Sequence, residues 1–311
     1  MDADSPWRIV FMGTPTFAVP ALEVLLAGTD AVVGVFTQPD KPVGRGMRLT
    51  PSPVKQLASQ HGVPVFQPPR LRAAEAVADL MAIQPDLIVV VAYGQILSPE
   101  VLAIPHQGCL NLHASLLPRW RGAAPLQRAL LAGDAESGVT LMRMEAGLDT
   151  GPLLNRCRQS LTPEMTGGEL HDLLAQQGAI LLQESLPLLK SGTLQAVPQP
   201  AEGVTYAAKI TPQDERIDWH RPALWIKRQI LALNPWPAAH TLLDGQPLKI
   251  FRCRLATGTG LPGTLIAQQR DGLEIACGEG SLVLTEIQPA SRRRLSASDW
   301  LRGQPALPDR F

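Results

Sequence analysis

The segment from Asp86 to Ala92 (DLIVVVA) most constrains what this chain can fold into, because it is apolar after its first residue. Such a segment is typical of a strand covered on both faces, as in a parallel sheet flanked by helices. Similar short apolar segments alternate with helical patterns through the first 190 residues of the 311-residue chain. The alternation predicts an α/β open sheet, in which ligands bind beyond the carboxyl ends of the strands.

The same periodicities place the individual elements of this first domain, residues 1–191. Strands are expected at 8–12, 31–37, 63–66, 86–92, 108–113, 139–144 and 153–161. Helices are expected at 17–27, 54–61, 73–83, 123–131 and 167–190. Gly192, Pro198 and Pro200 then interrupt the pattern, so we interpret residues 192–204 as a linker.

A second domain is expected over residues 205–311. It begins with one helical pattern at about 222–233, and short apolar segments follow at 248–255, 263–268, 273–277 and 281–287. Short strands with glycine-rich turns are typical of a small β-barrel or sandwich. Residues 204–311 carry 14 basic and 10 acidic side chains, against 14 and 18 in residues 1–203. The basic second half is compatible with a polyanionic partner, although scattered surface charges are an equally simple interpretation.

Several classes of protein are disfavoured by what the sequence lacks. The four cysteines lie far apart without zinc-ligand spacing, so we expect no metal and a reducing compartment. The acidic N-terminus does not resemble a signal peptide, and no apolar run reaches the roughly 18 residues of a membrane span. We therefore expect a cytoplasmic protein that has no membrane partner.

The turn after the first strand, Gly13 to Ala18, does not match a nucleotide-binding loop. A dinucleotide site requires GxGxxG here, whereas only the first glycine is present and Pro15 has no amide hydrogen to donate. The sequence also contains no GxxxxGK[ST] loop. Usual modes of NAD and ATP binding are therefore not expected.

Two polar residues interrupt the otherwise buried strand at 108–113. Asn111 and His113 point to one face of that strand because side chains alternate, and both lie near its carboxyl end, where open sheets place ligands. A structural histidine with satisfied hydrogen bonds is the alternative interpretation. Asp149, in Gly147–Gly151 (GLDTG), follows a later strand, and an ordinary turn is its alternative. Together, an amide, an imidazole and a carboxylate suit acyl transfer without a covalent intermediate.

At these residues the sequence resembles a known family. The segment from Asn111 to Pro125 (NLHASLLPRWRGAAP) resembles the signature of folate-dependent formyltransferases, and Asp149 matches their catalytic aspartate. Residues 11–15 (FMGTP), 38–46 (QPDKPVGRG), 217–219 (IDW) and 234–237 (NPWP) resemble methionyl-tRNA formyltransferases. The resemblance covers nearly the whole chain, from about residue 7 to about residue 302.

The resemblance implies a Rossmann-like open-sheet formyltransferase domain followed by an OB-like β-barrel. It implies that a formyl group passes from 10-formyltetrahydrofolate, the co-substrate, to the amino group of methionyl initiator tRNA, and we expect a monomer. Asn111, His113 and Asp149 are then the catalytic residues. The implied folate-binding residues are Tyr93, Gly94, Ser115, Leu116, Leu117 and Pro118.

The resemblance also turns two basic segments into candidates for tRNA binding. The first is the loop at residues 39–53, with Lys41, Arg45 and Arg48, and the second is a track formed with residues of the C-terminal half. The track would contain Lys209, Lys227, Arg228, Arg292, Arg293 and Arg294. Without the family, each of these basic segments is better interpreted as a solvated surface.

Three other functions use parts of the same sequence. The first domain could formylate a small amine, such as glycinamide ribonucleotide or an amino sugar nucleotide, or could release formate from the same folate. A catalytically dead RNA-binding protein is a further alternative, which the intact set of Asn111, His113 and Asp149 argues against.

Overall fold

The computed structural model describes residues 5–44, 46–303 and 311, and the chain divides into two compact units. The first unit contains the described residues up to Pro125, together with Ser137–Gln159 and His171–Ala207. The second contains Leu126–Glu136, Ser160–Leu170 and the described residues from Ala208 onward.

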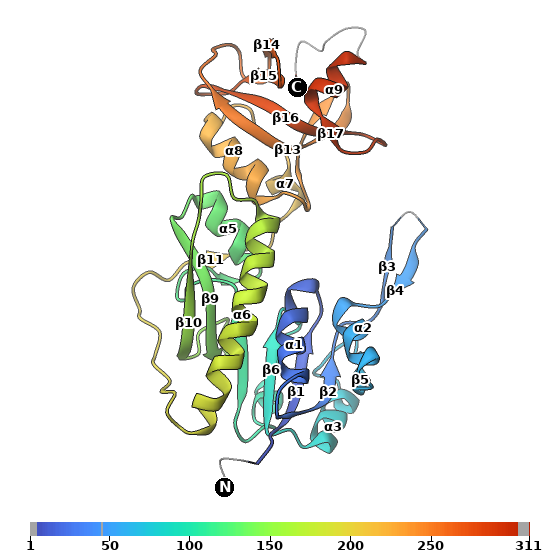
Figure 1. Cartoon of the computed structure of the whole chain (residues 1–311), viewed down its shortest axis with the longest axis vertical. Helices are drawn as coiled ribbons and strands as arrows, with labels where there is room; N and C mark the ends of the chain where they lie inside the picture. The colour runs from blue at the N-terminus through green and yellow to red at the C-terminus, as the bar shows by residue number, and fades with distance from the viewer. Residues whose placement is uncertain (1–4, 45, 304–310) are drawn as a thin grey trace. The chain divides into compact units, whose positions relative to one another are not determined.

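The first unit is built on a seven-stranded sheet with the order β10-β9-β7-β6-β1-β2-β5 (Figure 1). Neighbours from β7 to β5 are parallel, whereas β9 runs antiparallel to β7. The strands are β1 (Arg8–Gly13), β2 (Ala31–Phe36), β5 (Val65–Phe66), β6 (Leu87–Val91), β7 (Cys109–His113), β9 (Glu136–Arg143) and β10 (Leu153–Ser160). The predicted α/β open sheet is confirmed, with β6 fully buried as its apolar sequence requires.

Helices cover both faces of this sheet, so its central strands are apolar on both sides. On one face, Val10 and Ile88 pack in a cluster with Leu80 of α3 (Ala74–Ile83) and with Cys109 of β7. On the other face, Gly178 of α6 (Gly167–Lys190) lies against β7 and β9. The remaining helices of this unit are α1 (Val19–Leu26), α2 (Pro53–Gln60) and α4 (Pro99–Leu102).

Residues 41–50, which the sequence presents as a loop, contain a short hairpin of β3 (Lys41–Val43) and β4 (Arg48–Thr50). The hairpin extends away from α2 and β2 of the same unit (Figure 1). Its base is held by Asp40, whose carboxylate accepts hydrogen bonds from Lys55 and Gln67. These hydrogen bonds, with Lys55 first, hold the pKa of Asp40 below its ordinary value.

The second unit contains a separate antiparallel sheet with the order β12-β13-β16-β15-β14, and β17 pairs with β16. Its apolar core includes Ile226 and Ile230 of α8 (Ala223–Ala232), together with Trp219. The strands are β12 (Ala239–Leu243), β13 (Gln246–Ala256), β14 (Leu265–Gln269), β15 (Gly272–Ala276), β16 (Ser281–Pro289) and β17 (Leu295–Ser296). The unit also holds α5 (Pro125–Ala132), from Leu126 onward, α7 (Pro212–Glu215) and α9 (Ala297–Arg302). Among the described residues, no helix combines the length and the apolar character that a membrane crossing requires.

We expect the stability of the first unit to depend on the apolar strand β6. Ile88 is completely buried there, so Ile88→Ala should lower the free energy of unfolding by about 2–5 kcal/mol. Ile180 on α6 is half exposed, and Ile180→Ala is the matched control, expected to change stability by roughly 0.5 kcal/mol or less. Urea denaturation followed by circular dichroism measures both variants. Equal losses would contradict the placement of the core.

Candidate active site

The carboxyl end of β7 carries the predicted Asn111 and His113, and both side chains are buried. The Nε2 atom of His113 lies 2.8 Å from the main-chain oxygen of Trp120. A carbonyl oxygen can only accept a hydrogen bond, so Nε2 carries a hydrogen and donates it. This leaves Nδ1 of His113 facing Asp149, with 3.7 Å between Nδ1 and Oδ2 of the carboxylate.

Asp149 reaches this place from the loop between β9 and β10. Its Oδ2 accepts a hydrogen bond of 2.8 Å from the main-chain nitrogen of Gly122. Gly122 has a φ of 118°, and an added Cβ would lie 2.8 Å from the main-chain oxygen of Ala207. A side chain at this position would therefore displace the donor to Asp149, which explains why a glycine stands here.

The distance between His113 and Asp149 decides what this pair does. At 3.7 Å it is too long for a direct hydrogen bond, but it is short enough for an ion pair when the imidazole is protonated. Asn111 lies two residues earlier on the same face of β7. Among the described residues, none hydrogen-bonds its carboxamide, so this buried group is available to a ligand.

The predicted folate segment directly after β7 is held rigidly by hydrogen bonds. Ser115 is buried and donates from Oγ to the main-chain oxygen of Arg119 over 2.6 Å. Thr140 of β9 donates from Oγ1 to the carbonyl of Ser115 and accepts from the nitrogen of Leu117. Leu116 and Pro118, by contrast, are half-buried. The segment thus combines fixed main-chain polar groups with partly accessible apolar side chains.

At the other predicted folate segment, Tyr93 and Gly94, the ring of Tyr93 is buried in the core, so only the main chain of the segment is left to face a ligand. The carbonyl oxygen of Tyr93 accepts hydrogen bonds from Thr14 and Gln38, each 3.0 Å long. The ring lies in the apolar cluster of α3, and its hydroxyl has no partner among the described residues. Burial raises the pKa of this hydroxyl. A ligand beside this segment would therefore meet backbone.

Sequence reasoning missed Gln199, because it lies in the segment interpreted as a linker. Its Nε2 donates to the carbonyl oxygens of Asp149 and Gly151, over 2.7 and 2.8 Å. Its Oε1 accepts from Nε and Nη2 of Arg121, over 3.1 and 2.6 Å. A lone glutamine between two prolines has no periodicity or motif that could have identified it.

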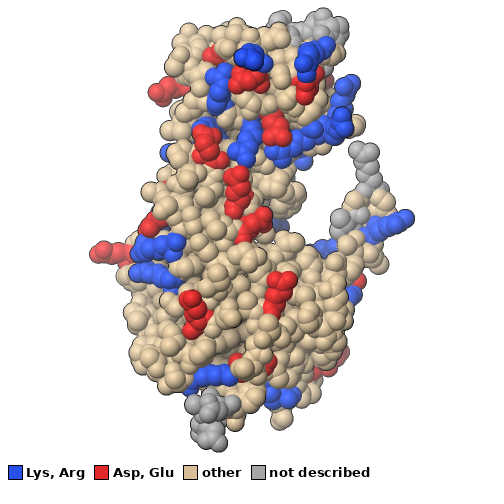
Figure 2. Space-filling view, viewed as in Figure 1, with Lys and Arg blue, Asp and Glu red and all other residues tan. Residues whose placement is uncertain are grey.

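The basic residues proposed to bind tRNA differ in how free their charges are. Lys41 and Arg48 are exposed on the β3–β4 hairpin, whereas Arg45 lies outside the described residues. Lys209 is exposed, and so are Arg292 and Arg293 in the turn before β17. Figure 2 shows Lys and Arg side chains gathered at this turn.

Two members of the predicted basic track are already paired. Arg294 binds both carboxylate oxygens of Glu286 at 2.6 Å and lies 4.2 Å from the ring centre of Phe251. Lys227 is buried and forms an ion pair with Glu164. The placement of Lys227 among the free charges of a solvent-facing track was therefore wrong, because its side chain is buried and its ammonium group is already paired with Glu164.

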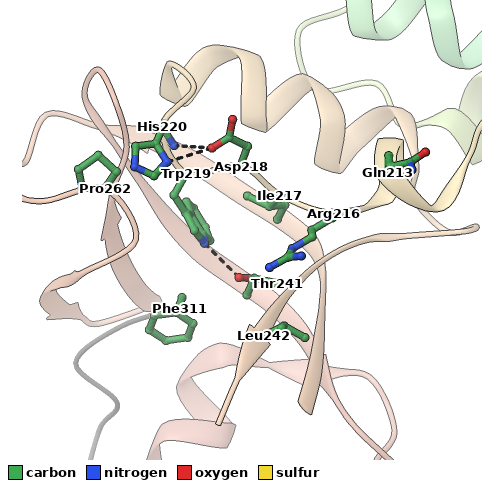
Figure 3. A pocket seen from close by; sticks show the side chains of 10 residues that line it. All are labelled: Gln213, Arg216, Ile217, Asp218, Trp219, His220, Thr241, Leu242, Pro262 and Phe311. Atoms are coloured by element: carbon green, nitrogen blue, oxygen red, sulfur yellow. Dashed lines mark hydrogen bonds and ion pairs between the residues drawn. The ribbon is translucent and has the colours of Figure 1, made fainter. Parts of the chain in front are cut away.

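A cavity of about 460 Å³ lies within the second unit (Figure 3). Trp219 in its wall donates from Nε1 to Thr241, and Asp218 accepts hydrogen bonds from the backbone and ring of His220. It contains none of the predicted catalytic residues. No group of three His, Cys, Asp or Glu side chains in the described part of the chain is placed to hold a metal ion.

Comparison with known protein families assigns both halves of the chain. Residues 7–196 match the family model described as formyl transferase, and residues 209–305 match the formyl transferase C-terminal domain. A methionyl-tRNA formyltransferase of Magnetococcus marinus is 57% identical, over 96% of this chain and 95% of the relative. One of Pseudomonas fluorescens is 54% identical, over 94% of this chain and 93% of the relative.

Solved structures share the fold at lower identity. An N-formyltransferase of Helicobacter canadensis, in complex with folinic acid and dTDP-3-aminofucose, has a TM-score of 0.67 at 18% identity, covering 91% of this chain and 99% of that chain. A methionyl-tRNA formyltransferase of Clostridium thermocellum has a TM-score of 0.56 at 17% identity, covering 80% and 93%. Two domain matches and relatives above 50% identity over almost the full length show that this chain belongs to the methionyl-tRNA formyltransferases of the formyl transferase family.

Proposed function

We propose that this protein transfers a formyl group from 10-formyltetrahydrofolate to the α-amino group of methionyl initiator tRNA. The observation that carries the proposal is the approach of Asp149 to His113 at the carboxyl end of β7, where Asn111 lies on the same face of the strand as His113. Amide and imidazole donors beside a carboxylate suit the transfer of an acyl group to an amine. The relatives named methionyl-tRNA formyltransferase support this choice of acceptor.

The three side chains have separate tasks in this reaction. The amino nitrogen forms a bond to the formyl carbon, and the bond from that carbon to the folate nitrogen breaks. Asn111 donates from its amide to the formyl oxygen, on which negative charge develops. His113 can donate to the same oxygen only through Nδ1, because Nε2 is held by the carbonyl of Trp120.

Asp149 controls the charge and the proton of the site. Its carboxylate lies 3.7 Å from Nδ1 of His113 and forms an ion pair with the ring when the imidazole is protonated, the form in which Nδ1 carries the hydrogen that the formyl oxygen needs. The amine loses a proton after it attacks, and the leaving nitrogen must gain one. Asp149 is placed to accept the first proton and to return it, directly or through water, so the reaction balances without another reactant.

The residues after β7 fit a folate. A flat heterocycle needs an apolar slot with a few fixed polar groups. Leu116 and Pro118 offer accessible apolar surface, while the main chain of Ser115 and Leu117 is fixed by Thr140. Tyr93 and Gly94 form a second stretch of main chain that we assign to the folate site, and it is fixed by the bonds of Thr14 and Gln38 to the carbonyl of Tyr93. We place the folate in residues 1–191 and the main tRNA contacts in residues 205–311, with 192–204 between them.

Other acceptors are separated by direct assay. Purified protein is incubated with formyl-labelled 10-formyltetrahydrofolate and, in parallel, methionyl initiator tRNA, methionyl elongator tRNA, glycinamide ribonucleotide and an amino sugar nucleotide. We expect label on initiator methionyl-tRNA. Transfer to a small amine instead would refute the proposed acceptor, and folate binding without any transfer or hydrolysis would refute catalysis.

Removing the charge of Asp149 without removing its contact to Gly122 is the sharpest test of the catalytic set. In Asp149→Asn the amide oxygen can still accept from Gly122, but the negative charge facing Nδ1 of His113 and the group proposed to carry the proton are gone. We expect kcat to fall on the order of 10²-fold or more, and His113→Ala to lose a similar amount. Steady-state kinetics and circular dichroism measure activity and fold. Turnover near the unmodified rate in either variant would remove that residue from the mechanism.

The exposed pair Arg292 and Arg293 is expected to contact tRNA phosphates. Replacing both by alanine should reduce the slope of log Kd against log salt by about 2, because each phosphate contact releases condensed counterions. Arg254 is the control, since it is exposed on β13 but already paired with Asp271. Filter binding at several salt concentrations measures the slopes. An unchanged slope in the double variant, or an equal change in Arg254→Ala, would place the phosphates elsewhere.

A further inference from the structure

Residues 197–208 lie between the two matched family regions, which end at 196 and begin at 209. The sequence there contains Pro198, Pro200 and Gly203, which are typical of a linker. The structure instead ties this segment to both loops of the candidate active site. The two loops are residues 118–123, after β7, and residues 147–151, which contain Asp149.

Gln199 connects the two loops through a single side chain. It donates to the carbonyls of Asp149 and Gly151 and accepts both hydrogen bonds from Arg121. Arg121 is buried, and its guanidinium group donates to the oxygen of this amide. An amide side chain donates two hydrogen bonds from its nitrogen and accepts others at its oxygen, which neither a carboxylate nor an apolar side chain can do.

The residues that follow hold the 118–123 loop from its other edge. The nitrogen of Trp120 donates to Oγ1 of Thr205 over 2.9 Å, and the nitrogen of Arg121 donates to the carbonyl of Thr205. A short parallel pair then forms between β11 (Tyr206–Ala207) and β8 (Arg121–Gly122). Segment 197–208 thereby fixes four consecutive residues of the loop, from Trp120 to Ala123.

These contacts matter because the 118–123 loop supplies a main-chain hydrogen-bond partner to each member of the proposed catalytic pair, His113 and Asp149. The carbonyl of Trp120 holds Nε2 of His113, and the amide of Gly122 holds Oδ2 of Asp149. A shift of this loop moves the imidazole and the carboxylate together. A shift of the Asp149 loop changes the 3.7 Å separation directly.

We propose that Gln199 is a positioning residue for formyl transfer that acts on Asp149, directly at its carbonyl and indirectly through Gly122 of the 118–123 loop. The proposal rests on the function proposed above. Gln199 touches neither substrate in this proposal, so its loss should slow catalysis without weakening binding. Misplacement of a catalytic group by about 1 Å can cost on the order of 10² in rate.

The test compares Gln199→Leu with Gln195→Leu. Gln195 lies just before this segment, four residues ahead of Gln199, is exposed, and donates only to the carbonyl of Gly192 among the described residues. For Gln199→Leu we expect kcat to fall by roughly 10- to 100-fold, with KM for folate and for methionyl-tRNA within about twofold. Gln195→Leu should match the unmodified protein in both constants. Normal kcat in Gln199→Leu, or a loss confined to KM, would overturn the proposal.

A second variant separates the donor role of the Gln199 side chain from its acceptor role. Gln199→Glu can keep the acceptor for Arg121, but it loses the donors to Asp149 and Gly151. We expect a loss of kcat in the same direction, and this variant carries the test if Gln199→Leu does not fold. Unmodified kcat in Gln199→Glu would show that the donors are not needed, which also contradicts the proposal.

A double-mutant cycle distinguishes positioning from a general structural role. If Gln199 acts through Asp149, Gln199→Leu should change the single-turnover rate by less than about twofold in an Asp149→Asn background. Multiplication of the two losses would show that Gln199 acts independently and would refute the proposal. Failure of the unmodified protein to formylate methionyl-tRNA would instead refute the proposed function, so the two failures are distinguishable.

Discussion

The hydrogen bond from Nε2 of His113 to the carbonyl of Trp120 is the interaction on which the geometry of the site depends. It fixes the ring orientation and commits one nitrogen as a donor to the protein. Only Nδ1 is then left for chemistry, on the side where Asp149 lies. Without this bond the imidazole could rotate or change tautomer, and Asp149 would no longer face a fixed nitrogen of the ring.

The strand β7 presents His113 at its end while its other face stays packed in the core of the sheet. Its buried apolar residues, such as Leu110 and Leu112, anchor it in the middle of the sheet. Its last residues on the opposite face are then presented at the carboxyl edge, where the neighbouring loops converge. The sheet is rigid because both faces are covered, so the loops at its edge need only short hydrogen bonds to fix the site.

The sequence predicts the parts of this design that have a period or a motif. The apolar residues of β6 and the alternation of Asn111 with His113 both follow from strand geometry. The partners that come from distant segments do not. The bonds of Gly122 to Asp149 and of Gln199 to Arg121 join residues 27 and 78 positions apart, and a hydrogen bond between loops leaves no repeat in the sequence.

The sequence likewise does not show which charged side chains are exposed and which are buried. Lys227 and Arg293 have the same formal charge in the sequence, yet Lys227 is buried against Glu164 while Arg293 is exposed. Composition cannot separate them, because burial of an ion pair depends on which acidic residue folds beside it. The β3–β4 hairpin is similarly hidden, since three-residue strands such as Lys41–Val43 are too short for a visible alternation.

The backbone conformation of Asp149 shows why segment 197–208 matters to the proposed formyl transfer. Its φ is 50°, a left-handed conformation that costs a non-glycine residue on the order of 1 kcal/mol and persists only where surrounding contacts impose it. Two contacts do so here, Gly122 on the carboxylate and Gln199 on the carbonyl. Because its carboxylate and its main-chain carbonyl are both held, Asp149 cannot relax toward the backbone conformation of an ordinary turn. The segment 197–208 therefore belongs to the candidate active site, although its sequence resembles a linker.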